Sequence, residues 1–197
     1  MKLYKTKKNC GKLLLGILAF CTGMILLTGC GSSSEQKQNK NEETAEENKE
    51  EDKVQIGLTV DSFVIERWIR DRDVFVATAR ELGAEVNVQD AGADVKEQIS
   101  QIEYFINKQV DVIVVIARDC GALSDAIQKA QSAGIPVISY DRMVNNANTD
   151  LYISFDNRKV GEIMAQALVN ALPQGGDVFM IQGSSSDNNV QMVKQGF

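Results

Sequence analysis

The sequence contains no histidine among its 197 residues. Histidine is the commonest general acid or base near neutral pH and a frequent ligand of zinc, so its absence removes the usual partner of a serine or cysteine nucleophile. The glycine-rich dinucleotide motif and the phosphate-binding loop motif are also absent, and the first predicted strand is followed by Asp61-Ser62-Phe63. We therefore predict no catalytic residues, no metal site and no cofactor.

Cysteine is scarce, and three of the four cysteines lie within the first thirty residues. Five lysines precede an apolar stretch at residues 13–27, which ends in Leu27-Thr28-Gly29-Cys30. A basic start, a short apolar segment and small residues before a cleavage point are typical of an export signal. The ending resembles the lipobox of bacterial lipoproteins, which implies that Cys30 is acylated after cleavage. The alternative is a plain signal-anchor helix, although the apolar stretch is short for a membrane span.

Negative charge dominates the rest of the chain. Residues 31–53 carry eight acidic residues and four lysines with almost no apolar side chains, which predicts a disordered polar tether. From residue 54 onward there are nineteen acidic and twelve basic residues, and the whole chain has a net charge of -6. Because nucleic acids bind to basic surfaces, this balance indicates that DNA and RNA are not partners.

From residue 54 the sequence alternates short β-branched runs with longer helical segments. This alternation predicts an α/β fold with a parallel sheet flanked by helices. The predicted strands are residues 54–60, 84–89, 111–116, 135–140, 152–155 and 178–182. The predicted helices are residues 66–82, 95–108, 120–133 and 160–171, and a further helix begins near residue 189.

Two opposite charges, Asp141 and Arg142, directly follow the predicted strand 135–140. In open α/β sheets, ligands bind outside the carboxyl ends of strands, so both side chains are expected to face a cleft. Aspartate accepts hydrogen bonds and arginine donates them, and together they suit an uncharged, hydroxyl-rich ligand such as a sugar. The alternative is an ordinary ion pair at the end of a strand.

Two further clusters are expected at the same edge of the sheet. Arg67 and Trp68 lie in the first turn of the helix 66–82, where an arginine can donate to hydroxyls and an aromatic face can stack on a sugar ring. Alternatively, Trp68 packs on the sheet and Arg67 pairs with Asp71 at helical spacing. Asp187 and Asn189 follow the strand 178–182 and are candidates for ligand contact, or Asp187 simply caps the next helix. Asp156-Asn157 is expected to be a cap or hinge.

These clusters resemble the type I periplasmic sugar-binding proteins of bacterial ABC importers, in particular those that bind D-xylose. The resemblance rests on Ile65-Glu66-Arg67-Trp68, Asp71-Arg72-Asp73, Ser100-Gln101-Ile102-Glu103, Tyr140-Asp141-Arg142-Met143, Tyr152-Ile153-Ser154-Phe155-Asp156-Asn157 with Val160-Gly161, and Asp187-Asn188-Asn189. It implies that two lobes close on a sugar and that the closed form docks on a membrane permease. Its ligand contacts would be Arg67, Asp141, Arg142, Asp187 and Asn189, with Trp68 close to them.

The resemblance also implies a domain organisation. The signal would occupy residues 1–30, the tether 31–53, the N-terminal sugar-binding lobe 54–156 and the start of an incomplete second lobe 157–197, in a truncated chain. The implied function is a lipid-anchored, extracytoplasmic receptor that delivers D-xylose or a similar pentose to an ABC importer. One alternative is a sensory subunit that presents the sugar to a membrane histidine kinase. Another is a secreted α/β hydrolase with Asp61 or Asp187 as nucleophile, which the lack of histidine disfavours.

Overall fold

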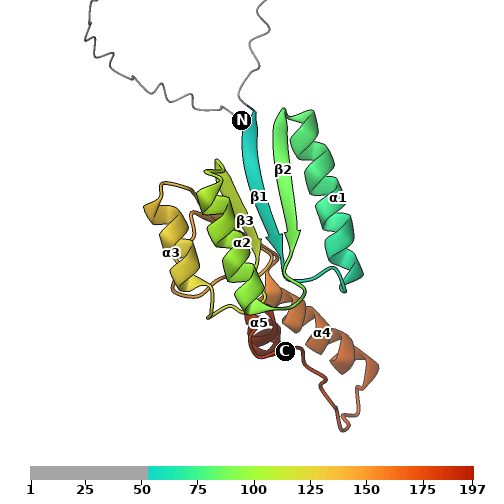
Figure 1. Ribbon diagram of the computed structural model, residues 1–197. Coiled ribbons are helices and arrows are strands. Elements are labelled where there is room, and N and C mark those ends of the chain that lie inside the picture. The colour runs from blue at the N-terminus through green and yellow to red at the C-terminus, as the bar shows by residue number, and fades with distance from the viewer. Residues whose placement is uncertain (1–52) are drawn as a thin grey trace, which may run out of the picture. The chain divides into compact units, whose positions relative to one another are not determined.

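The computed structural model describes residues 53–197, which form a parallel sheet with helices around it (Figure 1). The strands are arranged in the order β2-β1-β3-β4-β5, and every neighbouring pair is parallel. Their bounds are β1 Val54–Val60, β2 Ala84–Asp90, β3 Val112–Ile116, β4 Val137–Tyr140 and β5 Leu151–Ile153. The predicted fold class is confirmed.

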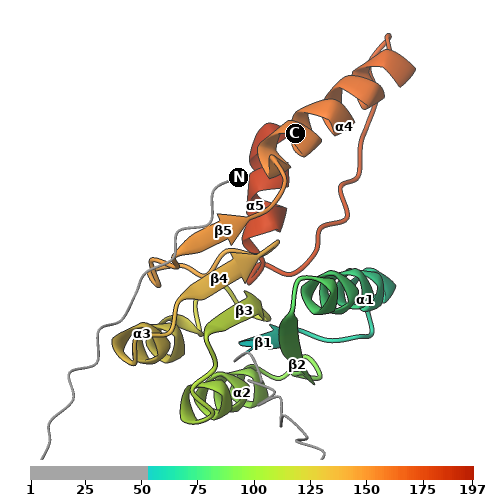
Figure 2. The ribbon, with the colours of Figure 1, turned by 90° about the horizontal axis from the view of Figure 1, so that it is seen from above.

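Helices lie on both faces of the sheet, as parallel strands that need crossover connections require. Helix α1 (Glu66–Glu81) covers one face, and α2 (Val95–Asn107) and α3 (Ser124–Ser132) cover the other (Figures 1 and 2). Helices α4 (Asn157–Ala171) and α5 (Asn188–Gly196) pack against each other beyond the carboxyl ends of the strands (Figure 1). This end of the sheet is where the candidate site residues were expected.

The larger apolar core lies between the sheet and the helices α2 and α3. Phe105 and Ile102 of α2 and Ile127 of α3 are fully buried there against strands β3 and β4. Gly57 of β1 makes room for this packing, because a Cβ at that position would lie 2.6 Å from the Phe105 ring. The close approach of α2 to β1 fixes the height of α2 relative to the strand ends.

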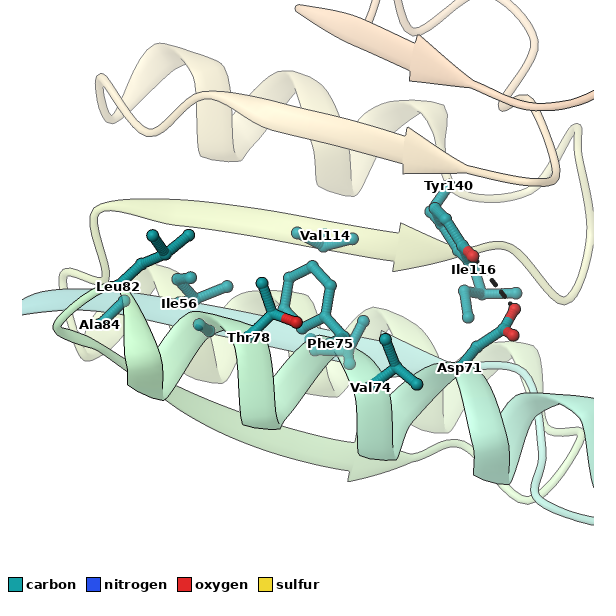
Figure 3. A pocket seen from close by; sticks show the side chains of 12 residues that line it. Ile56, Asp71, Val74, Phe75, Thr78, Leu82, Ala84, Val114, Ile116 and Tyr140 are labelled. Atoms are coloured by element: carbon teal, nitrogen blue, oxygen red, sulfur yellow. Dashed lines mark hydrogen bonds between the residues drawn. The ribbon is translucent and has the colours of Figure 1, made fainter. Parts of the chain in front are cut away.

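The face covered by α1 carries a smaller core and an open apolar groove of about 490 Å³. Figure 3 shows Phe75 of α1 beside Val114 of β3, with Leu82 near the far end of the groove. The other end is closed by the Tyr140 hydroxyl, which donates to a carboxylate oxygen of Asp71 at 3.1 Å. The groove therefore ends at Asp71 of α1, which also contacts Arg67, one of the predicted site residues.

One predicted strand is wrong. Residues 178–182 are not in a strand, and the side chains of Phe179 and Ile181 are 95% and 99% exposed. A strand needs a neighbour for its backbone N–H and C=O groups. Within residues 53–197 no strand lies beside this segment to supply one, so its β-branched and aromatic composition alone does not form the element.

The starts of two helices also differ from the prediction, and a nearby aspartate carboxylate accounts for each. Helix α3 begins at Ser124 rather than residue 120, because the Asp119 carboxylate accepts hydrogen bonds from the backbone N–H groups of Gly121 and Ala122 and holds a turn there. Helix α4 begins at Asn157 rather than residue 160, because the Asp156 carboxylate accepts from the Lys159 N–H at 2.9 Å. The expected cap at Asp156-Asn157 is thereby confirmed.

The predicted signal at residues 1–30, including Cys30, and nearly all of the predicted tether lie outside the described residues. None of the helices within residues 53–197 combines the length and the apolar character that a membrane crossing needs.

Candidate functional site

The six predicted site residues come together at the carboxyl edge of the sheet. Arg67 and Trp68 come from α1, Asp141 and Arg142 follow β4, and Asp187 and Asn189 begin α5. Direct polar contacts between these segments bring the first and last parts of the described chain to one place. The edge collects these side chains because all parallel strands end there.

Arg142 connects three segments through one guanidinium group. Its Nη1 donates to Asp61 Oδ2 at 2.7 Å and to the Ala117 carbonyl oxygen at 3.1 Å. Its Nε lies 2.9 Å from Asp187 Oδ2. The Arg142 side chain is only 12% exposed, so these charge-assisted bonds form largely away from bulk water.

Asp141 is the matching acceptor. Arg67 Nη2 donates to its Oδ2 at 2.6 Å, and Asn189 Nδ2 donates to its Oδ1 at 2.8 Å. Its backbone is in the left-handed region with φ 63°, which a residue other than glycine seldom adopts. The Asp141 carbonyl oxygen accepts from Ser154 Oγ at 2.7 Å and from Tyr152 Oη at 3.2 Å. These two hydroxyls hold the strained turn that aims the carboxylate into the site.

Trp68 lies close to the predicted contacts but does not present an open aromatic face. Its side chain is buried with Leu58 and Ile116, at 2% exposure. The Arg67 guanidinium carbon lies 4.4 Å from the ring centroid, and that of Arg142 lies 5.7 Å away. The alternative that Trp68 packs on the sheet therefore holds in this conformation, with Arg67 over the ring, and stacking of the ring on a ligand stays a prediction.

Arg67 and Asp187 each make both the helix contact and the site contact that the sequence offered as alternatives. Arg67 Nε lies 3.4 Å from Asp71 Oδ2, as helical spacing predicted, while its Nη2 bonds Asp141. Asp187 caps α5 by accepting from the Asn189 N–H at 2.9 Å, and its other oxygen meets Arg142. Each side chain has enough polar atoms to serve a structural and a site contact together.

The charged surroundings shift two pKa values. Burial alone would lower the pKa of Arg67, but the hydrogen bond and the charge of Asp141, helped by Asp71, raise it overall. Burial and the hydrogen bond to Asp71 raise the pKa of Tyr140, so its hydroxyl remains a donor at neutral pH. Arg67 and Tyr140 therefore both remain hydrogen-bond donors near neutral pH.

Three further residues belong to this cluster and were not predicted as contacts. Asp61, at the end of β1, is 2% exposed, and its Oδ1 lies 3.7 Å from Arg118 Nε. Arg118 comes two residues after β3, and Asp61 comes directly after β1. Both therefore lie at the carboxyl ends of strands, where ligands bind in open α/β sheets and where Asp141 was predicted to act. Asn157 donates through Nδ2 to Asn189 Oδ1 at 3.1 Å, a pairing that no local sequence pattern indicates.

Charges of both signs are paired in this cluster. Three arginines, Arg67, Arg118 and Arg142, face four carboxylates, Asp61, Asp71, Asp141 and Asp187. Within residues 53–197 no group of three or more histidine, cysteine or acidic side chains is placed to hold a metal ion. Such an array of mutually paired donors and acceptors suits an uncharged ligand with many hydroxyl groups better than an ion.

Comparison with known families agrees with this chemistry. Residues 56–197 match the model of a periplasmic binding protein domain. The chain belongs to the periplasmic binding protein family. It is 48% identical over 143 residues to the D-xylose-binding periplasmic protein of Escherichia coli, an alignment that covers 73% of this chain and 43% of that protein. It is 38% identical over 151 residues to the multiple sugar-binding periplasmic receptor ChvE of Rhizobium radiobacter, covering 74% of this chain and 43% of the receptor.

Solved periplasmic binding proteins share the fold. A solute-binding protein of an ABC transporter from Clostridium phytofermentans, with bound β-D-glucose, superposes with a TM-score of 0.69 and 27% identity. That superposition covers 72% of this chain and 46% of the other. The chain thus spans less than half the length of the relatives it matches, and these relatives are binding proteins rather than enzymes.

Proposed function

We propose that this protein binds D-xylose or a similar pentose outside the cytoplasm and delivers it to an ABC importer. The observation that carries the proposal is the cluster of paired charges in which Arg142 and Asp141 join segments from both ends of the described chain. A pentose offers hydroxyl groups that both donate and accept, and fixed arginines and carboxylates provide the complementary partners. The identity of 48% to a D-xylose-binding periplasmic protein supports the choice of sugar.

We further propose that the site is divided between two lobes. Residues 54–156 would form the N-terminal lobe, and residues 157–197 would begin a second lobe whose remainder belongs to a longer polypeptide. The coverage of 43% of the D-xylose-binding relative supports this division. In this arrangement Asp187 and Asn189 approach Asp141 and Arg142 from the second lobe, and closure removes the sugar from water.

Membrane attachment is part of the same proposal. Acylation of Cys30 would hold the protein on the extracytoplasmic face of the membrane, and residues 31–53 would let the lobes move above it. The support is the basic, apolar and small-residue pattern that ends at Cys30. Co-purification of the protein with a permease would support delivery to an importer, whereas co-purification with a kinase ectodomain would replace delivery by sensing.

Isothermal titration of the full-length protein against D-xylose, D-ribose, L-arabinose and D-glucose tests the sugar proposal. We expect saturable binding with D-xylose tightest and a dissociation constant in the micromolar range or below. No measurable binding of any of the four sugars would overturn the proposal. Incubation with a panel of xylosides serves as the check against a hydrolase, and we expect no sugar release.

A further inference from the structure

Gln98 of α2 is fully buried, with 0% exposure, on the face of the helix that packs against the sheet. A buried amide is costly unless its polar atoms are paired, and an apolar side chain would suit this position by pattern alone. Gln98 Nε2 donates to the Ile116 carbonyl oxygen at 3.0 Å, and its Oε1 accepts from the Arg118 N–H at 2.8 Å. The amide therefore bonds the backbone on both sides of Ala117.

The end of β3 needs such a partner because its sheet pairing stops there. The register with β1 ends at Ile116, and the register with β4 ends at Val115. Within residues 53–197 no strand pairs with the backbone of β3 beyond these residues, although Ile116 and Ala117 are buried. The side chain of Gln98 takes the place of a neighbouring strand for one carbonyl and one amide group.

The backbone that Gln98 holds carries two features of the site. The Ala117 carbonyl oxygen accepts from Arg142 Nη1 at 3.1 Å, the same nitrogen that bonds Asp61. The next residue, Arg118, places its Nε 3.7 Å from the other oxygen of Asp61. A shift of the Ala117 peptide would therefore move an acceptor of Arg142 and the start of the Arg118 side chain together.

We propose that Gln98 is a positioning residue for the ligand site, acting through the end of β3 on Arg142 and Arg118. This inference rests on the proposed function, since it concerns how the sugar-binding arginines are oriented. Gln98 itself bonds no side chain of the charged cluster. Its effect on the ligand would be entirely indirect.

Gln101 offers a matched control one turn further along α2. It is 3% exposed, accepts from Thr59 Oγ1 at 2.7 Å and donates through Nε2 to the Asp90 carbonyl oxygen at 2.9 Å. Its bonds hold the end of β2 and the Thr59 side chain of β1, to which Gln98 Nε2 also donates at 3.3 Å. Replacing Gln101 leaves both bonds of Gln98 to the β3 backbone in place.

The test compares Gln98→Met with Gln101→Met in the full-length protein. Methionine keeps the length of the side chain and removes its polar atoms, so both variants are expected to lose similar stability toward urea. We expect Gln98→Met to weaken D-xylose binding about tenfold and to speed hydrogen exchange of the Arg118 amide, which loses its acceptor. Gln101→Met should stay within about twofold of the parent affinity. If Gln98→Met does not fold, Gln98→Asn, whose shorter amide cannot span both bonds, replaces it.

The outcomes separate the two proposals. Binding by the parent protein together with equal affinities for the Gln98 and Gln101 variants would overturn the positioning role and leave the proposed function standing. A parent protein that binds none of the sugars would overturn the proposed function and the role of Gln98 with it. Weaker binding by the Gln98 variant alone, with faster exchange at Arg118, would support both.

Discussion

The Arg142 guanidinium bonds the ends of β1 and β3 and the start of α5. Each of its partners is a buried or nearly buried oxygen, and the arginine itself is almost enclosed. A ligand hydroxyl that enters the site would replace part of this set of partners rather than meet an open charge. The protein therefore presents a donor whose position is already fixed before the sugar arrives.

Arg142→Ala in the full-length protein is expected to reduce D-xylose affinity at least tenfold. Truncating one partner of a buried charged hydrogen bond costs roughly 2–5 kcal/mol, and about 1.4 kcal/mol corresponds to tenfold in affinity. Calorimetric titration measures the change. Arg72→Ala is the control, because Arg72 contacts the exposed Asp73 and the Phe63 ring rather than a residue of the charged cluster, and its loss should alter affinity little. Parent-like binding by both variants would contradict the assignment of the site.

The sequence predicted which residues lie in the charged cluster better than it predicted what those residues contact. The position of Asp141 and Arg142 after a strand was enough to place both side chains in the cluster. The packing of Trp68 on the sheet was one of two alternatives, and the sequence did not decide between them because the outcome depends on how deep α1 lies on the sheet. Arg118 was missed although the same strand-end rule applies to it, and Gln98 was missed because its partners are backbone groups of a distant strand.

Among the elements, α4 and α5 cross with almost no space between their backbones. Gly161 of α4 faces the Val193 carbonyl oxygen, and Gly196 of α5 faces the Arg158 carbonyl oxygen, so that a Cβ at either glycine would collide with backbone. This contact fixes where α5 begins relative to β4. The positions of Asp187 and Asn189 in the site therefore depend on a packing contact on the neighbouring helix.

Gly161→Ala is expected to destabilise the protein by roughly 1–3 kcal/mol, because an added methyl group in a packed contact forces the two backbones apart. D-xylose affinity should fall as well, since α5 carries Asp187 and Asn189. Urea unfolding and calorimetric titration measure the two effects. Gly176→Ala is the control, because a Cβ there meets only Leu172 at an ordinary 3.8 Å. An alanine at position 161 that leaves both quantities unchanged would show that α4 and α5 do not cross this closely.

Helices and strands were predictable where the local sequence determines them. They were less predictable where they depend on contacts with other elements. Strands β1 to β4 and helices α1 and α2 lie within a few residues of their predicted ranges, because their apolar runs and periodicity are strong. Helix α3 starts later than predicted because the Asp119 carboxylate accepts hydrogen bonds from two following backbone N–H groups, which is a local effect of one side chain. Residues 178–182 have strand composition, but strand formation requires a neighbouring strand that composition does not indicate.

For the whole molecule, the membrane attachment that we propose depends on the single thiol of Cys30. Cys30→Ala should block acylation, because only the cysteine can take the lipid, and the protein should accumulate as an unprocessed precursor. Labelling cells with a radioactive or alkynyl fatty acid, followed by immunoprecipitation, measures this directly. A Cys30→Ala protein that still carries the fatty acid label would rule out this anchor. The test is independent of sugar binding and of the fold.

We propose that the sugar binds at the carboxyl edge of the sheet, between segments on either side of residue 157. Peptide-resolved hydrogen exchange of the full-length protein, with and without saturating D-xylose, tests it most directly. We predict protection of the peptides that carry residues 61–68, 117–118, 141–142 and 187–189. Peptides at the opposite edge, around Gly83 and Gly134, should exchange as in the free protein. Protection at that opposite edge alone, or no change at residues 141–142 under saturating sugar, would contradict a sugar site at the carboxyl edge.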